Sequence, residues 1–396
     1  MKIQELILND VGGIKSAKIK FNEEMNIICG PNGIGKTTIL NSLTHAFISH
    51  YNYSKLKKRV NATEHGCFKI VINNNEEIIS KEFQIDSYDP ARVLCGKYDD
   101  SDLRKKCIFI GVSRIFDYKA LDALKKDDRP GESCLSQNIA NGIPLNNMKD
   151  WFANRCLLVG TPDALTENNK KNLEIAKNSF SIFNPDYSYA RADGKTFDIF
   201  VKTPNGEIWY EYLSSGFKSC LSIVFGIIKE IETRMEDAQC LVSEFDGVVL
   251  IDELELHLHP EWQSKIEIAL QEIFPQVQFI VTTHSPHIVQ SAKGDQIIAL
   301  AADDEGITYV RELPNSKYGY LGWTLDEVLQ DVMGMKSTQS EFLTEILSKF
   351  NAAIDSEQLD DAKENFEILN KMLHPKNPLR KMVNIDYKSI GGVIND

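Results

Sequence analysis

An eight-residue run near the N-terminus constrains this chain more than any other feature. Gly30–Thr37 reads Gly-Pro-Asn-Gly-Ile-Gly-Lys-Thr and fits the phosphate-loop pattern G-x-x-x-x-G-K-[ST]. The compact apolar run Met25–Cys29 comes before it, and apolar residues recur at helical spacing from Lys36 to about His50. A strand, a glycine-rich loop and a helix in this order are typical of a site that binds nucleotide phosphates.

The residue types in this loop have defined chemical uses. Glycine lets the backbone wrap around a phosphate without a Cβ in the way. Lys36 can reach the β- and γ-phosphates, and the Thr37 hydroxyl can ligate Mg²⁺. The sequence therefore predicts ATP and Mg²⁺ as cofactors. The candidate nucleotide-binding residues are Gly30, Pro31, Asn32, Gly33, Ile34, Gly35, Lys36, Thr37 and Thr38.

A second apolar run, Val248–Ile251, ends in two acidic residues, Asp252 and Glu253. Carboxylates in this position lie at the carboxyl end of a strand, where ligands bind to α/β sheets. We expect Asp252 to hold Mg²⁺ together with Thr37, and Glu253 to orient and polarise the attacking water. Strands often end in acids, so this motif gains its meaning from the phosphate loop upstream.

Two shorter segments complete the set of candidate site residues. Ser214, Ser215 and Gly216 stand where a helix is expected to begin, which makes either an anion site or a simple N-cap. His284 follows a third apolar strand, Val277–Thr282. It is either a structural histidine or a catalytic group that contacts the γ-phosphate from the same sheet edge as Asp252.

These four elements, in this order, resemble the ATP-binding cassette superfamily, and the strands before the phosphate loop are similar to its RecF/SMC branch. In that superfamily the serine-glycine signature of one subunit closes on the ATP held by another. The resemblance therefore implies a homodimer or higher homo-oligomer in which Ser214–Gly216 act in trans. The sequence departs from the superfamily pattern at two positions. Phe217 stands where the signature usually has Gln or Glu. The glutamine of the Q-loop cannot be placed in the sequence, and Gln84 and Gln137 are only guesses for it.

Four further segments resemble the ATPases of Septu-type and retron-linked anti-phage defence systems, the PtuA family. They are residues 251–263, 274–286, 324–335 and 373–381. Septu ATPases work with PtuB, an HNH nuclease encoded beside them, and this chain shows no nuclease motif of its own. The resemblance implies a subunit that binds and hydrolyses ATP and regulates an associated PtuB-like HNH nuclease through ATP-dependent dimerisation.

The order of predicted elements indicates an α/β fold: an ABC-type, RecF/SMC-like ATPase head with a β-rich N-terminal layer, a mixed insertion and a C-terminal helical extension. We expect residues 1–86 to carry the phosphate loop and residues 87–195 to form the insertion, with short helices at Tyr118–Lys126, Met148–Cys156 and Glu167–Ser181. Residues 196–312 would complete the head. Residues 313–396 would form the helical extension, a candidate surface for docking a partner.

Charge and hydropathy limit the partners. The net charge of −13 argues against a surface that coats nucleic acid, but it leaves room for a local basic patch. Lys55, Lys57–Arg59 and Arg104–Lys106 are the candidates for contacting DNA or RNA, with a solvated face as the plainer interpretation. No apolar run is long enough for a membrane span, no secretory signal is visible, and the eight cysteines are scattered, so we expect a cytoplasmic chain without a membrane partner.

Two other functions stay open at this point. One is a stand-alone RecF-like DNA repair ATPase that clamps DNA. The other is a nucleotide-sensing scaffold with little hydrolysis, which Phe217 and the missing Q-loop favour and Glu253 opposes. Glu255, His257 and His259 allow two interpretations. They could bind a metal ion, or they could belong to a loop at the dimer face.

Overall fold

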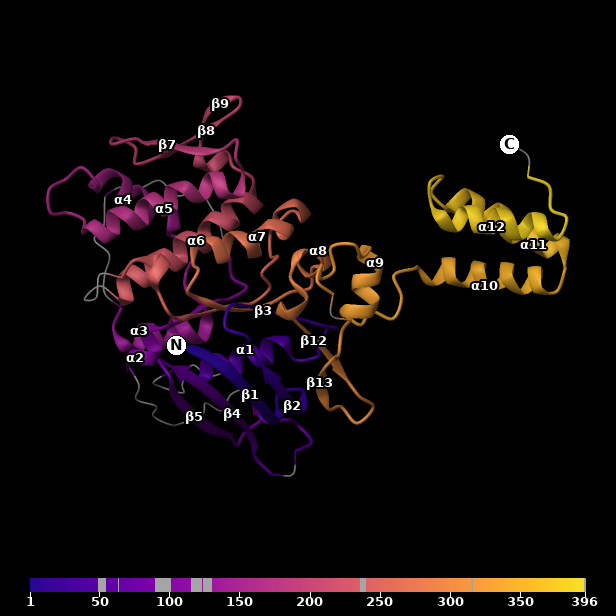
Figure 1. Ribbon diagram of the computed structural model, residues 1–396, viewed down its shortest axis with the longest axis horizontal. Helices are drawn as coiled ribbons and strands as arrows, with labels where there is room; N and C mark the ends of the chain where they lie inside the picture. Colours follow the sequence, from indigo (N-terminus) through magenta and orange to yellow (C-terminus); the bar gives the residue numbers. More distant parts are fainter. Residues whose placement is uncertain are drawn as a thin grey trace. The chain divides into compact units, whose positions relative to one another are not determined.

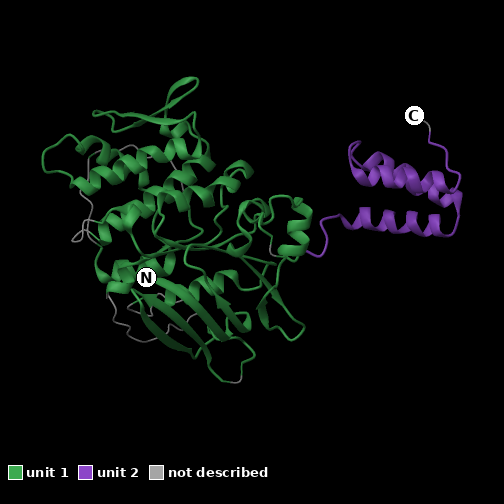
Figure 2. Ribbon diagram, in the orientation of Figure 1, with its two compact units in different colours: residues 1–334 green, residues 335–396 purple. Residues whose placement is uncertain are grey.

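The computed structural model describes residues 1–48, 55–62, 64–89, 101–114, 123, 130–235, 240–314 and 316–394. The chain forms two compact units, residues 1–334 and residues 335–396 (Figure 2). Apart from residue 123, the helix expected over Tyr118–Lys126 lies outside the described residues. The division into four parts that the sequence suggests stays a prediction.

A six-stranded sheet runs through the first unit and confirms the α/β class (Figure 1). Its strand order is β13-β12-β3-β11-β10-β6, and the five strands from β12 to β6 are parallel. The strands are β3 (Met25–Cys29), β6 (Cys107–Ile110), β10 (Val248–Ile251), β11 (Gln278–Thr282), β12 (Ile297–Ala302) and β13 (Thr308–Val310). Every residue of the first four is buried, as expected for a parallel sheet covered on both faces.

A second, antiparallel sheet forms the β-rich N-terminal layer. Its strands are β2 (Ile14–Lys20), β1 (Lys2–Val11), β4 (Gly66–Asn74) and β5 (Glu77–Ile85), in this spatial order. Its inner face and helix α1 (Lys36–His45) share one hydrophobic core with the central sheet. The β4–β5 turn centres on Asn75 and Glu76, which both have positive φ angles, 53° and 71°. The apolar runs Phe68–Ile72 and Ile78–Ile85, on either side of Asn73–Asn75, predict a hairpin here, and the antiparallel pairing of β4 with β5 confirms it.

The other face of the central sheet is covered by helices. They are α4 (Met148–Leu158), α5 (Glu167–Phe183), α6 (Ser215–Arg234) and α7 (Pro260–Ile273). Helix α6 is buried on nearly every side because it lies between the sheet and the outer helices (Figure 1). A small antiparallel sheet of β7 (Ser188–Ala192), β8 (Ile199–Thr203) and β9 (Gly206–Trp209) leads into it.

Short helices complete the first unit: α2 (Ser101–Lys105), α3 (Glu132–Asn141), α8 (Pro286–Ser291) and α9 (Leu325–Glu327). Tyr320, Val328 and Val332 belong to its core. The second unit consists of α10 (Glu341–Asp355), α11 (Leu359–Met372) and α12 (Pro378–Ser389), which the sequence predicts as two or three helices. They pack on one another around Phe350 and a stacked pair, Phe366 and Tyr387. Across the described ranges, no helix has the length and apolar character needed to cross a membrane.

Candidate nucleotide-binding site

The predicted phosphate loop joins the end of β3 to the start of α1. Gly30, Gly33 and Gly35 have φ angles of 144°, 76° and 105°, which L side chains rarely adopt. A Cβ on Gly30 would lie 2.6 Å from the Leu300 carbonyl oxygen, and one on Gly35 would lie 2.7 Å from the Ile14 side chain. The loop backbone can therefore take this path only with glycine at both positions.

Lys36 and Thr37 are the first residues of α1. Their side chains contact the phosphate loop and the residue that follows β10. The Lys36 ammonium is buried and donates to the carbonyl oxygens of Gly30 (2.8 Å) and Pro31 (3.0 Å), and burial lowers the pKa of this lysine. Carbonyls do not neutralise its charge, so the ammonium is suited to a phosphate. The Thr37 hydroxyl donates to Asp252 Oδ1 at 3.4 Å.

Asp252 and Glu253 follow β10 and are held by Thr282, the last residue of the neighbouring strand β11. The Thr282 hydroxyl donates to Asp252 Oδ1 (2.6 Å) and accepts from the Glu253 backbone N–H (2.8 Å). Glu253 has a φ of 51°, a left-handed conformation that is uncommon outside glycine and collects at functional sites. These contacts fix the Asp252 carboxylate and the Glu253 backbone at the end of β10.

The segment after β11 carries the predicted histidine. The exposed His284 donates its backbone N–H to Glu255 Oε1 (2.6 Å), and the Thr283 hydroxyl donates to Glu255 Oε2 (2.7 Å). Glu255 thus ties the loop after β10 to the loop after β11, and His259 N-caps α7. Within the described ranges, no group of three or more His, Cys, Asp or Glu side chains is placed to hold a metal ion.

The predicted signature residues begin α6. The Ser214 hydroxyl caps the helix by accepting from the Phe217 N–H (3.2 Å), and Ser214 and Ser215 are exposed. A Cβ on Gly216 would lie 3.2 Å from the His257 carbonyl oxygen, so the helix start packs closely on the loop after β10. Among the residues described, no hydrogen bond links Ser214–Gly216 to the phosphate loop of the same chain.

Phe217 points away from this surface. It is 1 % exposed and packs against the rings of Phe183, Tyr187 and Trp262, with centroids 6.4, 5.3 and 5.2 Å away. The aromatic side chain therefore anchors α6 to α5 and α7. The unusual residue at this signature position is explained by core packing, while its backbone still takes part in the N-cap.

The phosphate loop, the acidic pair and His284 meet at one edge of the sheet. They follow β3, β10 and β11, which are neighbouring parallel strands, so their carboxyl ends share that edge. The donor set fits an ATP–Mg²⁺ complex: a glycine cradle and a lysine for the phosphates, with one hydroxyl and one carboxylate for the ion. Mg²⁺ prefers few protein ligands because it keeps waters and substrate phosphates in its shell.

Sequence reasoning missed one residue of this edge, Arg114. It follows β6, the strand beside β10, and it is 3 % exposed. Its guanidinium donates to the carbonyl oxygens of Asp252, Glu253, Leu254 and Leu256. The compact apolar run of β6 before Gly111 is the signal that could have revealed this strand end. Neither Q-loop guess lies here, since Gln84 is on β5 and Gln137 is on α3.

The comparison with known proteins adds a family. A family model described as an AAA ATPase domain matches residues 1–141 and 159–289. The Septu protein PtuA of Bacillus thuringiensis is 40 % identical over 393 residues, which cover 99 % of each chain. The chain belongs to the PtuA family of ATPases. This result confirms the resemblance to the PtuA family drawn from residues 251–263, 274–286, 324–335 and 373–381.

Other matches to this PtuA-family chain cover less of it. The retron Ec83 probable ATPase of Escherichia coli is 33 % identical over 129 residues, 33 % of this chain and 24 % of that protein. The SMC head domain of Thermotoga maritima shares 14 % identity, with a TM-score of 0.48, over 79 % of this chain and 100 % of that one.

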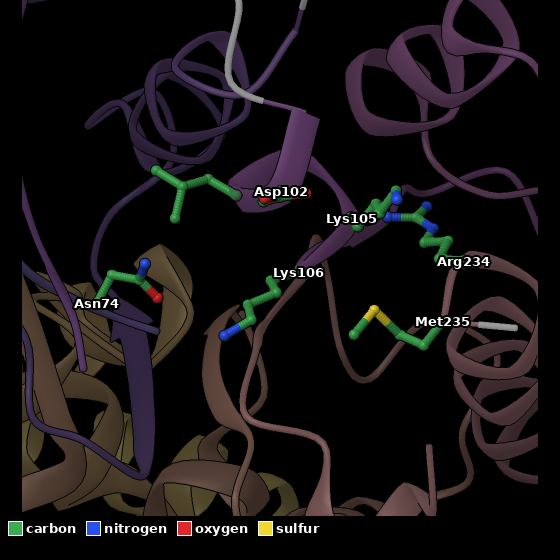
Figure 3. Close-up of a pocket in the computed structure, with 7 residues that line it drawn as sticks. Asn74, Asp102, Lys105, Lys106, Arg234 and Met235 are labelled. Atoms are coloured by element: carbon green, nitrogen blue, oxygen red, sulfur yellow. The ribbon is translucent and has the colours of Figure 1, made fainter. Parts of the chain in front are cut away.

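The basic residues named from the sequence fall into two groups, residues 55–59 and residues 104–106. Arg59 pairs with Asp10, and the buried Arg104 donates to the Phe47 carbonyl. Lys105 and Lys106 line a cavity of about 330 Å³ (Figure 3). Its lining is completed by Asn74, Asp102, Leu103, Arg234 and Met235. Because these lysines precede β6, the cavity lies at the amino end of that strand, opposite the end that leads to Arg114.

Proposed function

We propose that this chain binds and hydrolyses ATP with Mg²⁺ and thereby regulates an associated nuclease in an anti-phage defence complex. The observation that carries the proposal is the shared sheet edge, where the phosphate loop, Asp252–Glu253 and His284 follow three neighbouring strands in a chain of the PtuA family. The nuclease is expected to be a PtuB-like HNH protein, since the Bacillus thuringiensis relative is a Septu protein.

Each residue of the edge has a role in this proposal. The backbone N–H groups of residues 32–37 and the Lys36 ammonium bind the phosphates. Thr37 and Asp252 would hold Mg²⁺, which supplies neutralising charge and orients the phosphates. Glu253 accepts a proton from the attacking water and orients it, and its fixed backbone keeps the carboxylate in place. His284, exposed at the same edge, contacts the γ-phosphate.

The signature is proposed to act in trans. Ser214 and Ser215 are exposed at the start of a long helix, and the phosphate loop of their own chain makes no hydrogen bond to them in the described part of the structure. A second copy can then bring its Ser214–Gly216 edge onto the bound ATP. Dimerisation driven by ATP follows from this arrangement, because each nucleotide contacts two chains.

Docking of the nuclease is proposed for the helical unit 335–396, where Phe342, Met382 and Ile385 are more than half exposed. Binding of DNA or RNA would use the basic cavity beside Lys105 and Lys106.

The two alternative functions would give different experimental results. A RecF-like repair ATPase would bind DNA as an isolated chain with a steep salt dependence, and a nucleotide-sensing scaffold would bind ATP but leave it intact.

A mixing experiment tests composite sites. Lys36→Ala removes the phosphate contact, and Ser215→Arg places a bulky cation on the exposed signature. Each variant alone is expected to lose hydrolysis, whereas an equal mixture regains part of it, because one site of a mixed dimer combines an intact phosphate loop with an intact signature. No recovery in a mixture shown to exchange subunits would contradict action in trans.

Two measurements decide the remaining parts of the proposal. Glu253→Gln is expected to bind ATP as the wild type does and to lose single-turnover hydrolysis, and equal hydrolysis would remove Glu253 from its role. Purification from the native operon is expected to recover a nuclease with this chain. Recovery of this chain alone would count against the defence complex.

A further inference from the structure

The structure assigns a role to Arg114 that rests on the proposed hydrolysis. We propose that Arg114 is a positioning residue that fixes the loop after β10 and so holds Glu253 and Asp252 in their working orientation. This loop comprises residues 252–258. Arg114 itself touches neither nucleotide nor water in this account, and it acts through the loop backbone.

The contacts of Arg114 are unusual for a buried cation. One guanidinium nitrogen donates to the carbonyls of Asp252 (2.9 Å) and Glu253 (3.0 Å). The other donates to those of Leu254 (3.3 Å) and Leu256 (3.4 Å). All four acceptors are backbone groups of one short loop. A planar fork of donors can gather several carbonyls in fixed directions, which a single ammonium cannot do.

The loop needs such support because its backbone is strained. Glu253 and His257 have φ angles of 51° and 66°, and left-handed residues other than glycine persist only where neighbours hold them. The Arg114 acceptors include the carbonyl of Glu253 itself. Without the Arg114 guanidinium, the loop would leave a backbone conformation that it does not favour alone. The carboxylate of Glu253 would then lose its fixed direction.

The same loop also contacts the signature helix. The Ser219 hydroxyl of α6 donates to the Leu256 carbonyl (3.3 Å), the acceptor that Arg114 also uses. Arg114 therefore lies where the end of β6, the acidic pair and the start of α6 meet.

The test compares two arginine-to-lysine changes. Arg155 is the control, because its guanidinium also joins two elements of the first unit: it donates from α4 to the Glu232 carboxylate of α6 (3.1 Å). Arg114→Lys is expected to leave ATP affinity within about threefold and to lower single-turnover hydrolysis about tenfold to a hundredfold, as misplacement of a catalytic group does. Arg155→Lys should leave the hydrolysis rate of the folded protein unchanged.

Two further readouts separate positioning from damage to the fold. In a Glu253→Gln background, Arg114→Lys should lower hydrolysis no further, because both changes remove the same function. Amide hydrogen exchange should rise across residues 253–258 in Arg114→Lys and stay unchanged in the phosphate loop. Additive losses, or unchanged exchange in the loop, would overturn the inference. If the wild type itself hydrolysed no ATP, the proposed function would fail, while the exchange data would still decide the role of Arg114.

Discussion

Thr282 is the residue on which the geometry of the acidic pair depends most directly, and replacing it by valine isolates its hydroxyl. Valine keeps the branched shape that suits a buried strand. The change removes the hydrogen bond to Asp252 Oδ1 at 2.6 Å and leaves the Glu253 N–H without its acceptor at 2.8 Å. Thr282 is 1 % exposed, so water cannot easily replace the lost partner.

The magnitude follows from these two contacts. A hydrogen bond to a charged group contributes about 1.5–3 kcal/mol, and an unsatisfied buried donor costs about 1–3 kcal/mol. Both bonds share one hydroxyl, so we expect Thr282→Val to lower the free energy of unfolding by about 3 kcal/mol. Thr282→Ser keeps the hydroxyl and loses one methyl group, which should cost only about 1 kcal/mol.

Urea unfolding of both variants checks the stability, and single-turnover hydrolysis at saturating ATP checks the site. Thr282→Val should lose most of the rate because the Glu253 N–H and the Asp252 carboxylate both lose a partner that orients them, while Thr282→Ser should stay near the wild type. If valine and serine gave the same stability and the same rate, the argument that this hydroxyl organises Asp252 and Glu253 would be wrong.

Two other residues give independent predictions. Phe217→Gln should destabilise the protein by about 3 kcal/mol, because it buries an amide without partners in an aromatic cluster, and a rise in hydrolysis from the restored signature residue would contradict the packing role. Burial raises the pKa of Glu267 from 4.5 to about 7. Between these two pH values the Glu267 carboxyl keeps its proton in the folded state and loses it in the unfolded state. The free energy of unfolding therefore falls as the pH rises from about 4.5 to about 7. Glu267→Gln should therefore gain up to about 3 kcal/mol over the wild type at pH 8 and nothing at pH 4, as measured by denaturant unfolding; a gain that does not depend on pH would refute the assignment.

Much of the fold could be predicted because its signals are local. The apolar runs of β3, β10 and β11, the phosphate loop and the C-terminal helices each rest on patterns within a few neighbouring residues. Parallel strands then bring their carboxyl ends to one edge, so the proximity of the phosphate loop, Asp252 and His284 was also predictable. The loop glycines and the acidic pair at the end of β10 could be predicted without knowing which distant parts of the chain are in contact.

Only the tertiary structure decided which residues support that edge. The sheet order places β6 beside β10, although more than 130 residues lie between them in the sequence, and this pairing brings Arg114 to the acidic loop. Phe217 likewise depends on rings from three other segments. Strand order and core packing arise from contacts between distant parts of the chain, and no local pattern encodes them. The sequence by itself therefore determined the phosphate-binding chemistry, while the fold decided what holds that chemistry in place.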